Sequence, residues 1–250
     1  MFRRIALGLG VAALALAGIV FVLHLYGIGI DWNGNMSHVE IKNHAKSYAK
    51  VEESRAAQRT EAPPVKEPVD KPLEAAAATP AAPVKLVKAA YWTDFRGPNR
   101  AGEYAESPIN SDWPAAGLPR LWKQPIGGGY ASFTVGEGRA YTIEQRRDKE
   151  AVTAYDIETG RELWAFSYPA SFDEVLGGPG PRATPVYHDG LVYSLGAMGD
   201  LYCLSAATGK PKWSKNILSD NDTKNIHWAM AGAPLIVDDM VIVTPGGTSG

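Results

Sequence analysis

The chain has 250 residues, of which 45% are hydrophobic and 21% charged, a composition typical of a soluble domain that is large enough to bury a core. Its 25 basic and 27 acidic residues give a formal charge of −2 at pH 7, without the Lys/Arg cluster that marks nucleic-acid binding. The single cysteine, Cys203, excludes an intrachain disulfide and every paired-cysteine site for zinc, thiol redox chemistry or haem.

Residues 1–30 begin the chain with a long apolar segment. The run from Ile5 to Leu23 carries no charged side chain and follows Arg3 and Arg4. A helix of about 20 apolar residues spans a bilayer, and arginines before it favour a cytoplasmic N-terminus. We therefore expect a single-pass anchor in a bacterial inner membrane, with the rest of the chain in the periplasm or outside the cell. A cleaved signal peptide is the alternative, since residues 15–17 read Ala-Leu-Ala and resemble a cleavage site.

Residues 31–90 are rich in Ala, Glu, Lys and Pro and poor in large apolar side chains. Such a segment cannot bury enough surface to offset the entropy of ordering it. The composition predicts a disordered linker that reaches on the order of 40 Å root-mean-square as a flexible coil, with room for a short helix in residues 38–58. The prolines indicate a spacer, and a ligand for a proline-binding partner is the alternative.

The rest of the chain repeats itself. Thr153–Trp164 (TAYDIETGRELW) and Tyr202–Trp213 (YCLSAATGKPKW) share a small residue, a Thr-Gly turn and a final Trp. At the same spacing, the sequence from Ala183 aligns with that from Gly232, and a looser copy begins at Ala131. A period of about 50 residues is typical of repeat architectures such as propellers.

One repeat contains four short segments rich in Val, Tyr and Leu, separated by turn residues. They are Thr184–Asp189, Leu191–Gly196, Asp200–Ala206 and Lys210–Asn216. This pattern predicts a four-stranded antiparallel meander, which a propeller repeats at fixed spacing and a sandwich does not. We therefore expect an all-β fold over residues 91–250, a partial β-propeller of about three blades. The transmembrane helix and the disordered linker precede it.

This repeat resembles the β-propellers of the pyrroloquinoline quinone (PQQ) repeat type, shared by quinoprotein alcohol dehydrogenases and the outer-membrane assembly factor B lipoprotein. The family motif is Ala-x-Asp-x-x-Thr-Gly-x-x-x-Trp. The first copy matches every fixed position, whereas the second has Cys203 for the alanine and Ser205 for the aspartate. The motif positions are Ala154, Asp156, Thr159, Gly160, Trp164, Cys203, Thr208, Gly209 and Trp213. The resemblance implies a structural docking motif, in which each Trp lies on the Gly and the small residue of a neighbouring copy.

The resemblance implies two functions. A quinoprotein dehydrogenase holds PQQ on the propeller axis with calcium, an Asp base and adjacent cysteines, but this chain has no adjacent cysteines and no segment that aligns with the calcium ligands. We predict no catalytic or metal-binding residue in it. The assembly factor instead presents loops to protein partners. We therefore expect a membrane-anchored scaffold that binds proteins of the envelope and not nucleic acid. The alternative is a PQQ-dependent dehydrogenase whose ligands lie partly in blades missing from a truncated C-terminus.

Two long crossings between blades, Ala165–Arg182 and Ser214–Gly232, indicate where a ligand would bind. Long ordered loops on a rigid scaffold commonly carry binding sites. Arg182, His227 and Trp228 offer a cation, an imidazole and a large ring to an anionic or planar ligand such as PQQ. The alternative is that Arg182 pairs locally and Trp228 packs under its loop.

Overall fold

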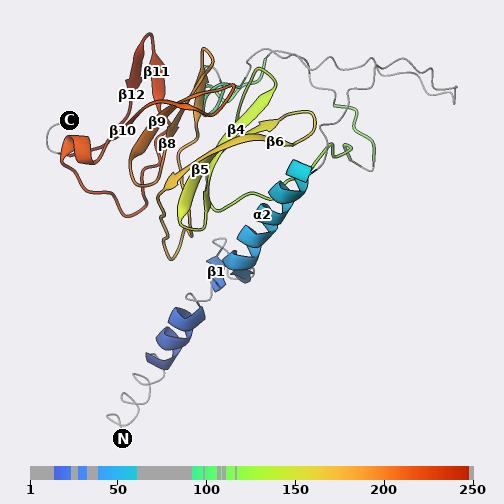
Figure 1. Ribbon diagram of the computed structural model, residues 1–250. Coiled ribbons are helices and arrows are strands. Elements are labelled where there is room, and N and C mark those ends of the chain that lie inside the picture. Colours follow the sequence, from blue (N-terminus) through green and yellow to red (C-terminus); the bar gives the residue numbers. More distant parts are fainter. Residues whose placement is uncertain are drawn as a thin grey trace, which may run out of the picture.

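The computed structural model of the chain describes residues 14–23, 28–32, 39–60 and 92–247, apart from residues 98, 106, 107, 109, 110 and 116. Antiparallel strands dominate these ranges, accompanied by the helix α2 (His44–Thr60) (Figure 1). The strands are β1 (Ile28–Trp32), β2 (Val39–Asn43), β3 (Thr134–Gly136), β4 (Arg139–Arg146), β5 (Lys149–Asp156), β6 (Glu162–Pro169), β7 (Val186–His188), β8 (Leu191–Leu195), β9 (Asp200–Ser205), β10 (Pro211–Asn216), β11 (Leu235–Val237) and β12 (Met240–Ile242). A 3-10 turn, η1, spans Ser219–Asn221.

Two four-stranded sheets form the body of the protein, with the strand orders β3-β4-β5-β6 and β7-β8-β9-β10. We call them the first and the second blade. Their first hairpins turn at Glu137-Gly138 and Asp189-Gly190, and all four residues have positive φ, between 46° and 75°. Two successive residues with positive φ give a turn whose twist matches that of the flanking strands. The all-β fold and the four-stranded units predicted from the repeat are therefore confirmed.

The two blades lie face to face, with β7 in contact with both β3 and β11 (Figure 1). Aromatic and aliphatic side chains from both blades fill the joint, and the rings of Tyr141 and Tyr187 stack with centres 5.8 Å apart. Its buried members are Tyr141, Ile143, Val152, Ala154, Tyr168, Tyr187, Val192, Leu204 and Ala206. β11 and β12 pair with each other and begin a third unit. Where the sequence predicts about three blades in residues 91–250, the described residues of that range hold two complete blades and one hairpin.

A lead-in segment, residues 92–102, runs past the inner strands of all three units. Trp92 exchanges both backbone hydrogen bonds with Val135 of β3, and the carbonyl of Thr93 accepts a hydrogen bond from the N–H of Tyr187 in β7. Further along, Arg100 donates from Nη2 to the carbonyl of Pro234, just before β11. One short segment therefore connects the three hairpins along their inner edges.

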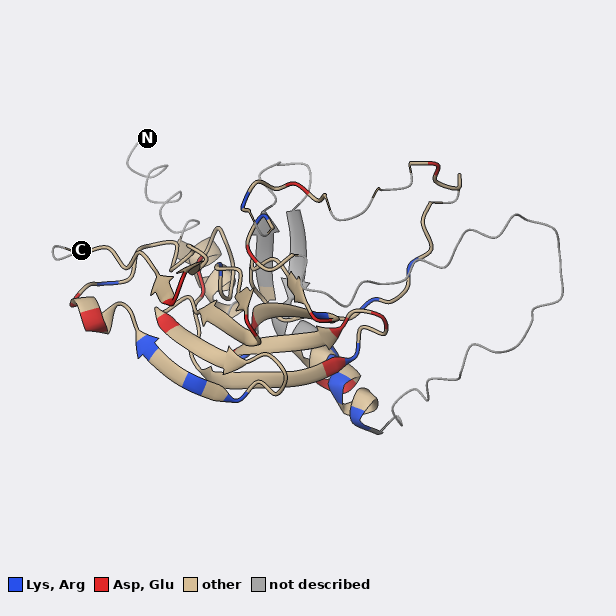
Figure 2. Cartoon of the chain, turned by 90° about the horizontal axis from the view of Figure 1, so that it is seen from above, with Lys and Arg blue, Asp and Glu red and all other residues tan. Residues whose placement is uncertain are grey.

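Within the expected linker, the short helix allowed for residues 38–58 corresponds to α2, which packs against the first blade (Figure 1). Basic and acidic residues are interspersed along this helix and along the strands (Figure 2). Of the expected anchor segment, residues 1–30, the structure describes residues 14–23, which are helical, and residues 28–30, which belong to β1. Among the described residues, no helix has the length and apolar character needed to cross a membrane. The anchor therefore remains a prediction.

Candidate functional site

The repeat motif forms the joint between the blades. The ring of Trp164 lies so close to Gly209 that a Cβ there would come within 2.5 Å of it, and Trp164 Nε1 donates to the carbonyl of Ala206 at 2.9 Å. Within each blade, Ala154 pairs with Trp164 and Cys203 pairs with Trp213 across neighbouring strands, and the two small residues are fully buried. A larger side chain at either position would have no room.

In each copy of the motif, the residue at the aspartate position, Asp156 or Ser205, accepts the hydrogen bonds that close the turn containing the glycine. Asp156 Oδ1 accepts hydrogen bonds from the backbone and hydroxyl of Thr159, and the carbonyl of Asp156 accepts the N–H of Gly160. In the second blade the carbonyl of Ser205 accepts the N–H groups of Thr208 and Gly209. The motif therefore builds a stiff turn on which a tryptophan can lie.

One further tryptophan, outside the two motif copies, docks on a motif glycine in the same way, and it was not predicted from the sequence. Trp122 lies on Gly160, where a Cβ would collide with its ring, and its Nε1 donates to the carbonyl of Ile157 at 2.9 Å. Trp122 thus docks on the first blade as Trp164 docks on the second. The signal is Gly117–Trp122 (GLPRLW), which keeps the glycine and the tryptophan of the motif but shifts their spacing by one residue.

The long crossings bring the predicted ligand-binding residues into one place, which we call the loop cluster and define as residues 172–182 and 226–228. A Cβ on Gly177 would contact Arg182 Nη2, Glu174 Oε2 and the ring of Trp228. His227 Nε2 lies 3.5 Å from Glu174 Oε1, and its ring stands edge-on to that of Trp228, with centres 5.0 Å apart. Arg182, His227 and Trp228, predicted from separate loops, therefore do gather.

Arg182 supports its own loop. Its Nη1 and Nη2 donate to the carbonyls of Gly180 and Gly178, and its guanidinium carbon lies 4.8 Å and 5.1 Å from the ring centres of Phe172 and Tyr130. Burial lowers the pKa of Arg182. With two aromatic rings close to its guanidinium and both outer nitrogens engaged, this cation holds the loop together.

Glu174 has a complementary role at the surface of the cluster. Its Oε2 accepts the backbone N–H groups of Leu176 and Gly177, at 3.0 and 2.6 Å. Burial opposes its charge, but these two donors and the nearby His227 hold the pKa of Glu174 below its usual value. The carboxylate stays ionised and fixes the turn that carries Val175 and Leu176.

The loop cluster exposes apolar side chains. The exposed fractions are 91% for Val175, 64% for Leu176, 55% for Ile226 and 50% for Trp228. Such side chains on ordered loops, next to the polar contact between His227 and Glu174, suit burial against another molecule. The loop cluster is therefore the candidate binding surface of the described residues.

A buried carboxylate lies at the same end of the blades. Glu150 is fully buried, accepts the N–H of Ala197 at Oε1 (2.9 Å) and accepts the hydroxyl of Tyr168 at Oε2 (2.6 Å). Burial raises the pKa of Glu150 above its ordinary value. A Cβ at Gly196 would collide with this carboxylate and with Tyr168. In the described part of the chain, no three His, Cys, Asp or Glu side chains form a group that could hold a metal ion.

Comparisons with known proteins find a match to one family model and two kinds of similar protein. Residues 148–249 match the family described as outer membrane protein assembly factor BamB. Over 103 residues the chain is 29% identical to a 1-butanol dehydrogenase (cytochrome c) of Thauera butanivorans, a match that covers 38% of this chain and 14% of that enzyme.

Solved structures of both kinds are similar in part. The quinohemoprotein alcohol dehydrogenase of Comamonas testosteroni has 25% identity and a TM-score of 0.35, over 46% of this chain and 17% of that one. BamB of Moraxella catarrhalis has 21% identity and a TM-score of 0.21, over 45% of this chain and 41% of that one. The chain thus spans less than a fifth of the length of these dehydrogenases and less than half of this BamB. The resemblance to the PQQ-repeat β-propeller family, predicted from the Thr-Gly-x-x-x-Trp motif, is confirmed by the match over residues 148–249.

Proposed function

We propose that this chain is a scaffold of the bacterial envelope that binds a partner protein through the loop cluster. The observation that carries the proposal is the set of exposed apolar side chains, Val175, Leu176, Ile226 and Trp228, on loops that Arg182 and Glu174 stiffen. Stiff loops lose little entropy when they bind, and a tryptophan at the centre of a patch commonly supplies much of the binding energy. The family match to an outer membrane assembly factor supports the same role.

The proposal includes a location. The N-terminal segment from Ile5 to Leu23 anchors the chain in the inner membrane, and the blades lie on the other side. A reporter fused after Ala90 tests this location. We expect activity from a reporter that works only outside the cytoplasm, and activity of a reporter that works only inside it would contradict the proposed topology.

Site-specific photo-crosslinking in living cells tests the binding function. A photoreactive phenylalanine analogue at Val175 should give one discrete adduct, since the side chain there is almost fully exposed in the loop cluster. The adduct should disappear in a chain that also carries Trp228→Asp. The control is the same analogue at Lys212, an exposed position on β10. Equal adducts from both positions, or none from Val175, would contradict binding through the loop cluster.

A PQQ-dependent dehydrogenase is the second candidate, favoured by the similarity to a 1-butanol dehydrogenase. The described residues do not fit the cofactor well, because the guanidinium of Arg182 is engaged by two carbonyls and covered by two rings. Titration of PQQ and calcium into the protein and into Arg182→Ala and Trp228→Ala separates the candidates. Binding by the parent chain that both variants lose would favour the dehydrogenase.

A further inference from the structure

The two faces of the first blade differ in chemistry. Side chains alternate between the faces of a sheet, so one face of β4 and β5 carries Tyr141, Ile143, Val152 and Ala154 and meets the second blade. The opposite face, which we call the polar face, is equally buried. It carries Thr142, Glu144, Thr153 and Tyr155, with exposed fractions of 0–2%, and the partly buried Glu162 of β6 lies next to it.

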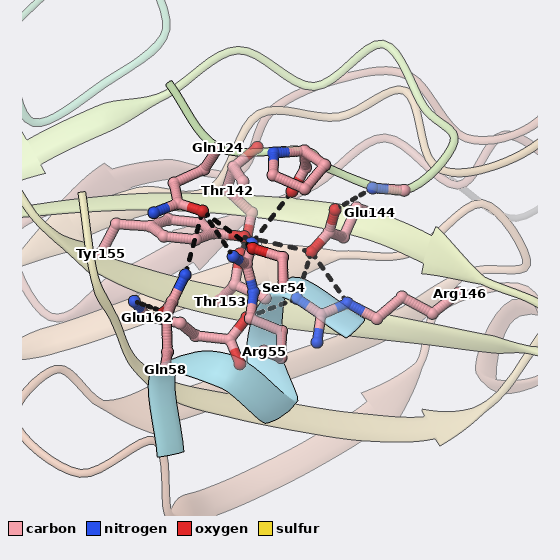
Figure 3. A network of polar contacts seen from close by, with 12 residues as sticks. Ser54, Arg55, Gln58, Gln124, Thr142, Glu144, Arg146, Thr153, Tyr155 and Glu162 are labelled. Carbon is pink, nitrogen blue, oxygen red and sulfur yellow. Dashed lines mark hydrogen bonds and ion pairs between the residues drawn. The ribbon is translucent and has the colours of Figure 1, made fainter. Parts of the chain in front are cut away.

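Helix α2 covers the polar face and inserts Arg55 into it (Figure 3). The side chain of Arg55 is 2% exposed, and its Nε donates to Glu162 Oε2 at 2.8 Å. Its Nη2 donates to the hydroxyl of Tyr155 at 2.9 Å and to the carbonyl of Pro125 at 3.0 Å, and its Nη1 donates to Gln124 Oε1 at 3.1 Å. Every nitrogen of this buried guanidinium thus has an acceptor.

The carboxylates of the polar face are arranged around this cation. Glu144 accepts the hydroxyl of Tyr155 at 3.2 Å and is paired with Arg146, which also reaches Glu162 (Figure 3). Burial and the negative charge of Glu144 raise the pKa of Tyr155 to about 12. The phenol therefore stays protonated while it accepts from Arg55 and donates to Glu144. The carboxylates of Glu144 and Glu162 face the guanidiniums of Arg55 and Arg146, so the charges on the polar face balance.

Further contacts fix the helix along its length. Gln58 Nε2 donates to Gln124 at 2.9 Å, and Gln58 Oε1 accepts the N–H of Glu162 at 2.9 Å. Arg147 and Glu52 form a two-pronged ion pair at 2.8 and 2.9 Å, and Val51 is 1% exposed. The helix is thus held mostly by directed polar bonds. Such bonds demand one register, and a buried charge that loses its partner is strongly destabilising.

We propose that the polar face is a receptor for an arginine-bearing helix, which α2 fills in cis. Because α2 docks, the first blade is attached to the chain at residues 44–60. The predicted linker of residues 31–90 therefore does not separate the blade from the N-terminal part of the chain over its whole length. Only residues 61–91 then act as a connection. Because α2 and its receptor belong to one chain, α2 meets the polar face at an effective concentration on the order of millimolar.

Binding of a peptide in trans tests the receptor. The probe is a fluorescent peptide of residues 44–60, added to the full chain and to its Arg55→Glu variant, with binding followed by anisotropy. We expect the peptide to bind the variant at least tenfold more tightly than the wild-type chain, whose receptor is already filled. A peptide that itself carries Arg55→Glu should bind neither chain, whereas a peptide with Arg59→Glu, an exposed position of the same helix, should behave as the wild type. Equal binding to both chains, or equal binding by all peptides, would overturn the proposal.

Amide hydrogen exchange covers the case in which Arg55→Glu does not fold. Arg55→Lys keeps the positive charge but removes the guanidinium, whose nitrogens donate to four acceptors. The amides of α2 should then exchange at least tenfold faster than in Arg59→Lys, with no change in β4 and β5. Unchanged exchange in α2 would show that Arg55 does not hold the helix and would overturn the proposal.

Discussion

Glycine serves two separable purposes in the turns of this protein. Gly209 has φ of +69° and also leaves room for the ring of Trp164, whereas Gly190 has φ of +73° and faces open space, so that a Cβ there would meet no atom within 4 Å. Gly190→Ala should lower the free energy of unfolding by about 1 kcal/mol through the backbone alone. Gly209→Ala should lose a further ~1–3 kcal/mol through overpacking. Urea unfolding of the two variants measures the difference, and equal losses would show that the tryptophan contact is unimportant.

Glu150 should make stability depend on pH. Its pKa is raised in the folded protein by burial, above the ordinary 4.5, so the folded state binds a proton more tightly than the unfolded chain. The carboxyl therefore contributes most below pH 4.5, and this contribution is lost as the pH rises through the folded pKa, by about 1.4 kcal/mol for each unit of the shift.

Glu150→Gln removes this titration, because the amide can still accept from Ala197 and meet Tyr168. The difference in unfolding free energy between the wild type and the variant should shift against the wild type as the pH rises above 4.5. Chemical unfolding at a series of pH values measures it. A difference that stays constant with pH would mean that the pKa of Glu150 is not raised.

The residues of the loop cluster can be predicted from the sequence only in part. Arg182, His227 and Trp228 are predicted from loop length and chemistry, and they do meet around Gly177. Their partners Glu174 and Phe172 are not, since a loop carries no periodic pattern that says which way its side chains turn. The chemistry of a loop can be inferred from its residues, but its contacts depend on tertiary structure.

At the scale of elements, three tryptophans differ in how closely they pack. Trp122 and Trp164 each lie on a glycine of a neighbouring turn, while Trp213 is 40% exposed. Truncating a well-packed tryptophan costs about 3–5 kcal/mol. Trp122→Ala and Trp164→Ala should therefore both lower the melting temperature by several degrees more than Trp213→Ala. Thermal unfolding measures the order, and a Trp122→Ala variant as stable as the wild type would remove Trp122 from the docking series.

The strands and α2 differ in how well the sequence predicts them. The alternation and turn residues of β7 to β10 identify each strand, because a half-buried strand needs that pattern. The residues of α2 include good helix formers and no proline, but they lack a broad apolar stripe. Composition therefore favours a linker with room for a short helix, and it does not predict that this helix docks on a blade. The helix is ordered by directed bonds to the first blade, and the strongest of these, from Arg55, cannot be recognised in the sequence alone.

At the scale of the molecule, the lead-in segment decides whether the three units move together. Arg100 is its last tie: Nε donates to Asp94 Oδ2 and Nη2 to the carbonyl of Pro234, both at 2.8 Å. Within the described part of the chain, the buried Oδ1 of Asp94 has no hydrogen-bond partner. Loss of Arg100 would thus leave a largely buried carboxylate without its only charged partner in the described residues, and β11 without its connection to the lead-in.

We therefore expect Arg100→Ala to loosen the third hairpin. Amides of Leu235–Val237 and Met240–Ile242 should exchange at least tenfold faster, since local opening there no longer breaks a bond to Pro234, while β4 and β5 keep their protection. The matched control is Arg96→Ala, which also has positive φ and whose side chain, within the described residues, donates to the nearby carbonyl of Ala101. If both variants raised exchange equally in all strands, the lead-in would stabilise the fold as a whole and would not act as a specific tie between its inner strands.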